Sequence, residues 1–208
     1  QLNYEHTDEK LVVNTVTMWN GNYYIGTDSG IAVSYAAAGS ILANGDYIQK
    51  QDSSVNELVN KFVKELDNVR IRCITTDSKN NMWICKGIYE VTYSGEIIRY
   101  DENNGLSGNR YRTITELSDN TMLAAGDTGL SYIVDEAVIG NIGYSMKNSK
   151  VLCTLETDIQ DYGRVILAGT DGNGIEVISD GRVIDNYDKD DGLSSAVILR
   201  MVKDASGE

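Results

Sequence analysis

Short stretches of alternating apolar and polar residues recur along the chain. In residues 69–74 the apolar side chains Val69, Ile71 and Cys73 are separated by arginines, and this period of two predicts a strand with one buried face. Residues 196–202 form another short apolar stretch. Because the chain has 20 Gly and no Pro, its reversals must depend on Gly, Asn, Asp and Ser. The pattern therefore predicts many short antiparallel strands.

These strands belong to a repeat that occurs four times. In each copy an apolar strand follows an Asn- or Gly-containing turn, reaches a small residue, and is followed by a turn that ends in glycine. Each copy has one large residue in this strand, which we expect to be buried: Tyr24, Trp83, Leu123 and Leu167. The distances between these residues in successive copies are 59, 40 and 44 positions. Units of about 40 to 45 residues with four strands are typical of β-propeller blades. We expect positive φ at the turn glycines Gly30, Gly129 and Gly174.

The repeats predict an all-β fold: a partial β-propeller of about four four-stranded antiparallel blades with one inserted amphipathic helix. A second motif, Tyr-Asp followed by Gly-Leu-Ser, occurs in residues 100–107 and 187–194 and ends a blade. The expected organisation is the last strand of a preceding blade at 1–10, complete blades at 11–68, 69–108, 109–149 and 150–195, and the first strand of a following blade at 196–208. The third blade is degenerate after Ile133.

The long spacing between the first two copies is explained by an insertion at residues 54–67. Apolar residues at 55, 58, 59, 62, 63 and 66 have helical periodicity, and Ser54 with Glu57 fits a capping box. The apolar stripe of this helix must be covered, either by its own blades or by a partner.

The aligned copies resemble the two-component regulator propeller repeat. The best matches are residues 71–88, residues 22–31 and the two Gly-Leu-Ser turns. The resemblance implies the extracytoplasmic sensor domain of a hybrid two-component histidine kinase or a diguanylate cyclase. Such a domain would be non-catalytic and would bind a ligand, often an oligosaccharide. We then expect a bacterial, periplasmic or cell-surface segment of a membrane-anchored protein.

Charge and composition narrow the range of partners. A net charge of -13 would repel a phosphate backbone, so we expect no nucleic acid. No stretch approaches the length of a membrane span, so we expect no membrane contact in this segment. The expected partners are a small carbohydrate-like ligand, the remaining blades of the receptor and, through open propeller ends, a second copy.

The candidate binding residues lie on the loops that join strands two and three, and on those that join consecutive blades. Both sets of loops fall on the same face of a propeller. Carboxylate, amide and guanidinium groups there suit a hydroxyl-rich ligand or a cation, although the same groups also cap turns in their own loops. The candidates are Asp28, Arg70, Asn109, Arg110, Asp127, Asp171 and Asn173.

Other chemistry has weaker support. Residues 188–192 hold three carboxylates, but their glycine is one place too early for a 12-residue calcium loop, so a solvated turn is favoured. We assign no catalytic residue, metal ligand or cofactor. A structural or protein-interaction propeller remains the first alternative function, and a carbohydrate-active enzyme the second.

The three cysteines leave two interpretations open. Cys73 and Cys85 are about equally far from the turn between their strands, so they could be cross-strand neighbours joined by a disulfide. Alternatively, all three cysteines, Cys153 included, are small buried apolar residues.

Overall fold

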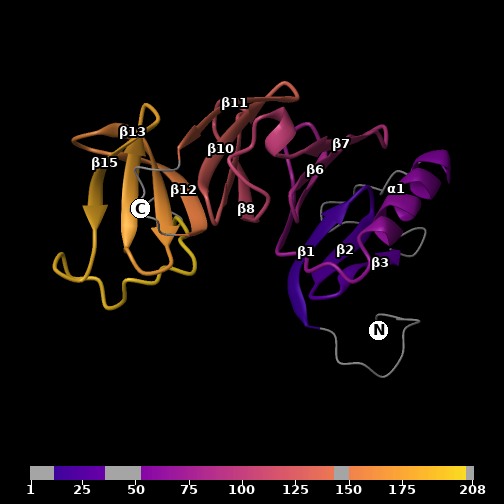
Figure 1. Ribbon diagram of the computed structural model, residues 1–208, viewed down its shortest axis with the longest axis horizontal. Helices are drawn as coiled ribbons and strands as arrows, with labels where there is room; N and C mark the ends of the chain where they lie inside the picture. The colour runs from indigo at the N-terminus through magenta and orange to yellow at the C-terminus, as the bar shows by residue number, and fades with distance from the viewer. Residues whose placement is uncertain (1–11, 36–52, 143–149, 205–208) are drawn as a thin grey trace. The chain divides into compact units, whose positions relative to one another are not determined.

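The computed structural model describes residues 12–35, 53–142 and 150–204, and in them the chain forms antiparallel sheets (Figure 1). The chain divides into two compact units, Gln1–Arg99 and Tyr100–Glu208. Each unit holds two consecutive sheets, called blades 1 and 2 in the first unit and blades 3 and 4 in the second. Within each sheet the strands follow chain order. These are the blades of a partial β-propeller, which confirms the predicted fold class.

Blade 1 consists of β1 (Val13–Trp19), β2 (Asn22–Thr27) and β3 (Gly30–Tyr35). It thus has three strands in the part of the chain that the structure describes, where the repeat predicts four. The fourth would fall within residues 36–52, which lie outside the described residues. The strand expected at residues 1–10 lies outside them as well.

Blade 2 consists of β4 (Cys73–Thr76), β5 (Met82–Cys85), β6 (Ile88–Val91) and β7 (Ile97–Tyr100). The turn of this blade links an aspartate, an asparagine and a tryptophan through side-chain hydrogen bonds. Trp83 Nε1 donates to Asp77 Oδ2 at 2.9 Å, and the Asn81 backbone N–H donates to Asp77 Oδ1 at 2.7 Å. Asn81 Nδ2 also donates to Glu90 Oε1 at 3.0 Å. Asp77, Asn81 and Trp83 therefore fix the turn of the β4–β5 hairpin through their side chains.

Blades 1 and 2 share one hydrophobic core that includes Trp19, Tyr24, Ile71 and Ile84. Backbone contacts join the two sheets near this core, because the Ile71 N–H donates to the Thr27 carbonyl at 2.9 Å. The approach is close: a Cβ placed on Gly26 would lie 2.8 Å from Ile71 Cγ2. Only a residue without a side chain fits at this position.

The inserted helix α1 spans Ser53–Glu65, close to the predicted 54–67, and lies beside the blade 1 sheet (Figure 1). Val59, Phe62 and Leu66 are buried in the core of the first unit, and the Phe62 ring lies 5.2 Å from that of Tyr89 in blade 2. The helix therefore packs on its own blades. The Ser54 side chain of the expected capping box lies outside the described residues. No described helix has the length and apolar character needed to cross a membrane.

The second unit begins with a 3-10 turn, η1 (Glu102–Asn104), and continues into two four-stranded sheets. Blade 3, degenerate in sequence, still forms its fourth strand, because Asp135 and Glu136 both adopt positive φ and close a tight turn after β10. The strands of blade 3 are β8 (Tyr111–Glu116), β9 (Met122–Gly126), β10 (Gly129–Val134) and β11 (Ala137–Ile142). Those of blade 4 are β12 (Val151–Ile159), β13 (Gly163–Thr170), β14 (Ile175–Ser179) and β15 (Arg182–Tyr187).

Blades 3 and 4 also share a core, which includes Leu123, Leu130, Val151 and Ala168. The large repeat residues Tyr24, Trp83 and Leu123 are buried as expected, at 1%, 3% and 0% exposure. Leu167 is only partly buried. The reason is its orientation: Ala168 and Ile166 face blade 3, so Leu167 lies on the opposite face of its sheet.

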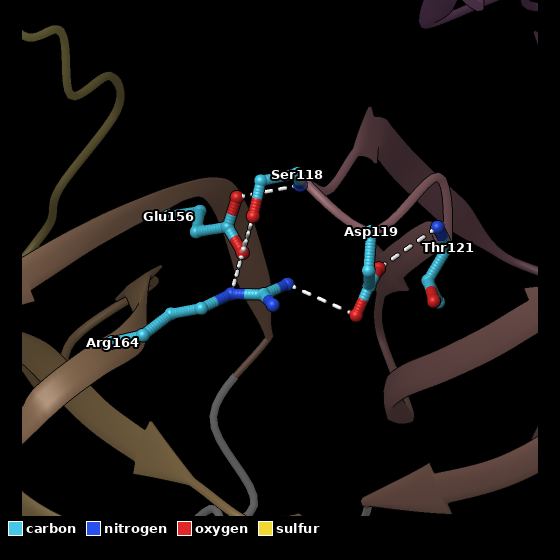
Figure 2. Close-up of polar contacts among 5 residues, drawn as sticks. All are labelled: Ser118, Asp119, Thr121, Glu156 and Arg164. Atoms are coloured by element: carbon cyan, nitrogen blue, oxygen red, sulfur yellow. Dashed lines mark hydrogen bonds and ion pairs between the residues drawn. The ribbon is translucent and has the colours of Figure 1, made fainter.

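A polar clasp also joins blade 3 to blade 4 (Figure 2). Arg164 on β13 pairs with Glu156 on β12 and, through Nη2, with Asp119 Oδ2 at 3.0 Å in the β8–β9 turn. Glu156 Oε2 in turn accepts from the Ser118 N–H at 2.7 Å. Hydrogen bonds from Thr121, reinforced by Arg164, hold the pKa of Asp119 below its ordinary value.

Residues 196–204 form no named strand, but they begin along the edge of blade 4. Asp171 and Val197 form an isolated antiparallel bridge, and the Ile198 N–H donates to the Thr170 carbonyl at 2.9 Å. This is the contact that Ile71 makes with Thr27 in the first unit. That residues 196–208 begin a further blade stays a prediction.

Candidate functional site

The turn after the second strand places an aspartate at the same position in blades 1, 3 and 4. The backbone N–H of each aspartate donates to the carbonyl just before the first strand of its own blade, at 3.2, 2.9 and 2.9 Å. The three pairs are Asp28 with Val12, Asp127 with Arg110, and Asp171 with Lys150. Each of these turns is a candidate site within its own unit. The glycine that ends each turn has positive φ, at Gly30 (125°), Gly129 (110°) and Gly174 (69°), as predicted.

A bulge in the first strand supplies a neighbour for each aspartate. The register of the first and second strands shifts between Val13 and Thr15, between Tyr111 and Thr113, and between Val151 and Cys153. The extra residue is therefore Asn14, Arg112 or Leu152. Bulges change the direction of a side chain, and in blades 1 and 3 the bulged residue reaches the aspartate.

In blade 1 the structure brings two of the predicted residues together. Asp28 Oδ1 accepts from Arg70 Nε at 3.0 Å and from Asn14 Nδ2 at 2.8 Å. Arg70 comes from the segment that leads into blade 2, so the group spans two blades. The side chain of Arg70 is 55% exposed, and that of Asp28 is 40% exposed. The pair is thus open to solvent and to a ligand.

In blade 3 the arrangement is similar but more enclosed. Arg112 Nε donates to Asp127 Oδ1 at 2.6 Å, and the two side chains are 25% and 19% exposed. Asn109 and Arg110 are exposed on the segment that leads into β8. The structure thus places Asp127 beside the Arg110 backbone, and the side chain that it holds is that of Arg112.

Hydroxyl groups lie next to this pair. Ser107, the serine of the Gly-Leu-Ser motif, has its Oγ 3.1 Å from Thr128 Oγ1 and 3.2 Å from Tyr111 Oη. Tyr111 Oη is 2.7 Å from Ser131 Oγ, and both residues are fully buried. The motif therefore attaches the turn to blade 3 through a chain of hydroxyls.

Blade 4 differs from blades 1 and 3 in the residues that surround its aspartate, Asp171. Leu152 replaces the polar bulge residue, and Val197 takes the place that Arg70 has in the first unit. Within the described residues, no side-chain donor reaches the exposed carboxylate of Asp171. Asn173 is committed elsewhere, since its Nδ2 donates at 2.7 Å to Glu176, which is 1% exposed.

The acidic turn at residues 188–192 is held by its own backbone. Asp188 Oδ1 accepts from the Asp190 N–H at 2.8 Å, and Asp191 Oδ2 accepts from the Asp188 N–H at 3.0 Å. These are turn-capping contacts. In the described ranges, no group of three or more His, Cys, Asp or Glu is placed to hold a metal ion.

Sequence reasoning missed Asn14, Arg112 and Glu176. Asn14 and Arg112 are each the second residue of a strand in which apolar and polar residues otherwise alternate. That break in alternation is the one signal that could have revealed the bulge.

No protein-family model matches the sequence, and no curated protein matches it. Solved structures do match. One is the extracellular domain of BT4673 from B. thetaiotaomicron, a protein described as a hybrid two-component system, with a TM-score of 0.59 and 19% identity over 90% of this chain. A second is virginiamycin B lyase from Staphylococcus aureus, with a TM-score of 0.54 and 16% identity over 86% of this chain. The WD40 domain of Neurospora crassa Pan2 has a TM-score of 0.50 and 14% identity over 85%.

At these identities the likeness establishes the propeller fold. The chain spans 24%, 56% and 50% of the three matched chains, so it corresponds to part of each. The presence of an extracellular two-component domain among these structures agrees with the resemblance read from the repeats.

Proposed function

We propose that this chain is a non-catalytic, ligand-sensing propeller segment of an extracytoplasmic bacterial receptor, and that it binds a carbohydrate-like ligand at the aspartate turns of its blades. The fold is that of a two-component extracellular domain, which supports a sensor role. The proposed partners are this ligand, further blades of the receptor and a second copy. The proposed contact residues are Asp28, Arg70, Asn109, Arg110, Asp127, Asp171 and Asn173.

The observation that carries the proposal is the contrast between Asp171 and its counterparts. Asp28 and Asp127 accept hydrogen bonds from Arg or Asn side chains, whereas apolar residues occupy both donor positions around Asp171. A carboxylate accepts up to about four hydrogen bonds, so Asp171 can serve the hydroxyl groups of a sugar. The guanidinium of Arg70 in the first unit and the amide of Asn109 in the second are donors of the kind that orient such ligands.

A binding experiment tests this assignment. The purified chain is screened against a panel of neutral and acidic oligosaccharides by thermal shift, and hits are measured by calorimetry. We expect Asp171→Asn to weaken binding of a hit by about tenfold, because one charge-assisted hydrogen bond contributes roughly 1.5 kcal/mol. Asp180→Asn is the matched control: Asp180 is exposed in the β14–β15 turn, and its φ of 46° suits asparagine.

The outcomes separate the alternatives. Equal weakening by Asp171→Asn and Asp180→Asn would place the ligand elsewhere, and a panel without any hit would contradict carbohydrate binding. Release of a product from any sugar would contradict the non-catalytic assignment.

A protein-interaction role is favoured by one surface of blade 1. Val16, Met18 and Tyr23 are 55%, 43% and 43% exposed. Met18 lies opposite Tyr23 in register, and Val16 is two residues before Met18, so the three share one face of the sheet. Exposed apolar sheet faces of this kind are contact surfaces, and a second copy or another blade would suit it.

A further inference from the structure

Two thiols face each other where β4 and β5 of blade 2 run side by side. Cys73 is the direct register partner of Cys85 on the neighbouring antiparallel strand. Cys85 is fully buried, Cys73 is partly exposed, and neither is bonded to another cysteine in this structure. The sequence left open whether the two residues are cross-strand neighbours, and the register shows that they are.

The same crossing exists in the other three blades, with other residues. The equivalent pairs are Thr15 with Gly26, Thr113 with Ala125, and Cys153 with Gly169. In blades 1, 3 and 4 the first-strand residue comes directly after the bulge residue, and in all four blades its partner is small. Blade 2 is the one blade in which both positions carry sulfur.

The geometry of the equivalent crossings in blades 4 and 1 is close to that of a disulfide. A Cβ placed on Gly169 would lie 2.6 Å from Cys153 Sγ, and one placed on Gly26 would lie 2.7 Å from Thr15 Cγ2. In a disulfide the Cβ of one cysteine is about 3 Å from the sulfur of the other. Directly opposed residues also have Cα atoms about 4.5 to 5.5 Å apart, inside the range of about 4.4 to 6.8 Å found in disulfides. We therefore expect Cys73 and Cys85, as direct register partners, to reach disulfide geometry with little backbone movement.

We propose that Cys73 and Cys85 form a cross-strand disulfide when the protein meets a disulfide oxidant. The Cys73 thiolate attacks one sulfur of the oxidant, which forms a mixed disulfide and releases one thiol. The Cys85 thiolate then attacks the Cys73 sulfur, which closes the protein disulfide and releases the second thiol. Two thiol hydrogens pass from the protein to the two oxidant sulfurs, so atoms and electrons balance. This inference concerns blade 2 alone and is independent of the ligand-binding role.

The environment of the two thiols sets the order of these steps. Burial, with smaller contributions from the neighbouring Cys73, raises the pKa of the Cys85 thiol well above its ordinary value. Thiolates are the attacking species, so the partly exposed Cys73 reacts first. Closure should accelerate as the pH rises in the alkaline range, because more Cys85 is then ionised.

The test uses the native 208-residue chain and oxidised glutathione. After incubation, the protein is unfolded without reductant and its free thiols are alkylated and counted by mass spectrometry. We expect the count to fall from three to one, with Cys153 as the alkylated residue and a peptide pair linked through Cys73 and Cys85. The oxidised protein should also melt about 5 °C or more above the reduced one, since the bond closes a loop in the unfolded chain.

The double variant Cys73→Thr/Cys85→Ala is the matched control, because blade 3 has this pair at the same crossing. Its melting temperature should not respond to glutathione, whereas Cys153→Ser should respond as the wild type does. Three free thiols after prolonged oxidation at pH 9, or a disulfide that involves Cys153, would overturn the proposal. Peptide mapping of the wild type decides between these results even if the double variant does not fold.

Discussion

At the scale of single residues, one of the closest backbone approaches in the second unit is at Gly126. A Cβ there would lie 2.1 Å from the Arg110 carbonyl oxygen and 2.7 Å from the Tyr111 Cα, both backbone atoms that cannot move aside. We therefore expect Gly126→Ala to lower the free energy of unfolding by about 3 kcal/mol. Gly140→Ala in the same blade is the control, because nothing lies within 4 Å of its Cβ position. Urea denaturation measures both changes, and equal stability of the two variants would contradict the clash.

Single residues also show which contacts can be predicted from the sequence and which cannot. The buried positions of Tyr24, Trp83 and Leu123 follow from the repeat alone, because a residue that recurs in phase at a strand centre must fill the same space in each blade. The partners of Asp28 and Asp127 could not be predicted in this way. Asn14 and Arg112 reach them from bulges, and the register shift of a bulge depends on the tertiary fit of two strands.

At the scale of elements, the clasp between blades 3 and 4 has a defined pH dependence. The pKa of Asp119 is lowered in the folded state, so its stabilising effect is present above the ordinary aspartate pKa and is lost as the pH falls through the lower, folded value. Asp119 and Arg164 are 51% and 45% exposed, which limits the effect to less than about 1 kcal/mol. Asp119→Asn should therefore destabilise the protein modestly at pH 7 and by much less near pH 3.

Denaturation curves of wild type and Asp119→Asn at the two pH values measure this difference. Asp180→Asn removes one exposed negative charge from blade 4 as a control and should give no comparable loss at pH 7. If the gap between wild type and Asp119→Asn were the same at both pH values, the clasp would not depend on the Asp119 charge.

Element boundaries show a similar division between what sequence predicts and what it does not. The apolar period of residues 55–66 predicts α1 almost to its ends, because a helix with one apolar stripe needs no information from its partners. The repeat predicts a fourth strand in blade 3, but the position of β11 could not be read from the third copy, because the Tyr-Asp-Gly-Leu-Ser motif is missing from it. The strand forms nonetheless, since two residues with positive φ close the turn and β10 offers an open edge.

At the scale of the whole molecule, the two compact units should respond separately to a local change. Both tryptophans of the chain, Trp19 and Trp83, lie in the first unit, so tryptophan fluorescence reports on that unit alone. Circular dichroism reports on the strands of both. We expect Gly126→Ala to shift the circular dichroism transition in urea while the fluorescence midpoint stays within about 0.2 M of wild type. An equal shift by both probes would instead show one cooperative unit.

Gly26 and Gly169 lie in close contact with the segment that follows their blades, and a side chain at either position would not fit. Gly26 and Gly169 would each push a Cβ to 2.8 Å from an isoleucine of the following segment, Ile71 or Ile198. A side chain added at Gly26 or Gly169 would press against that isoleucine and force the following segment outward, whereas blades 2 and 3 accommodate Cys85 and Ala125 at the equivalent position. A designer who wished to change the distance between blades 1 and 2 would therefore begin at Gly26.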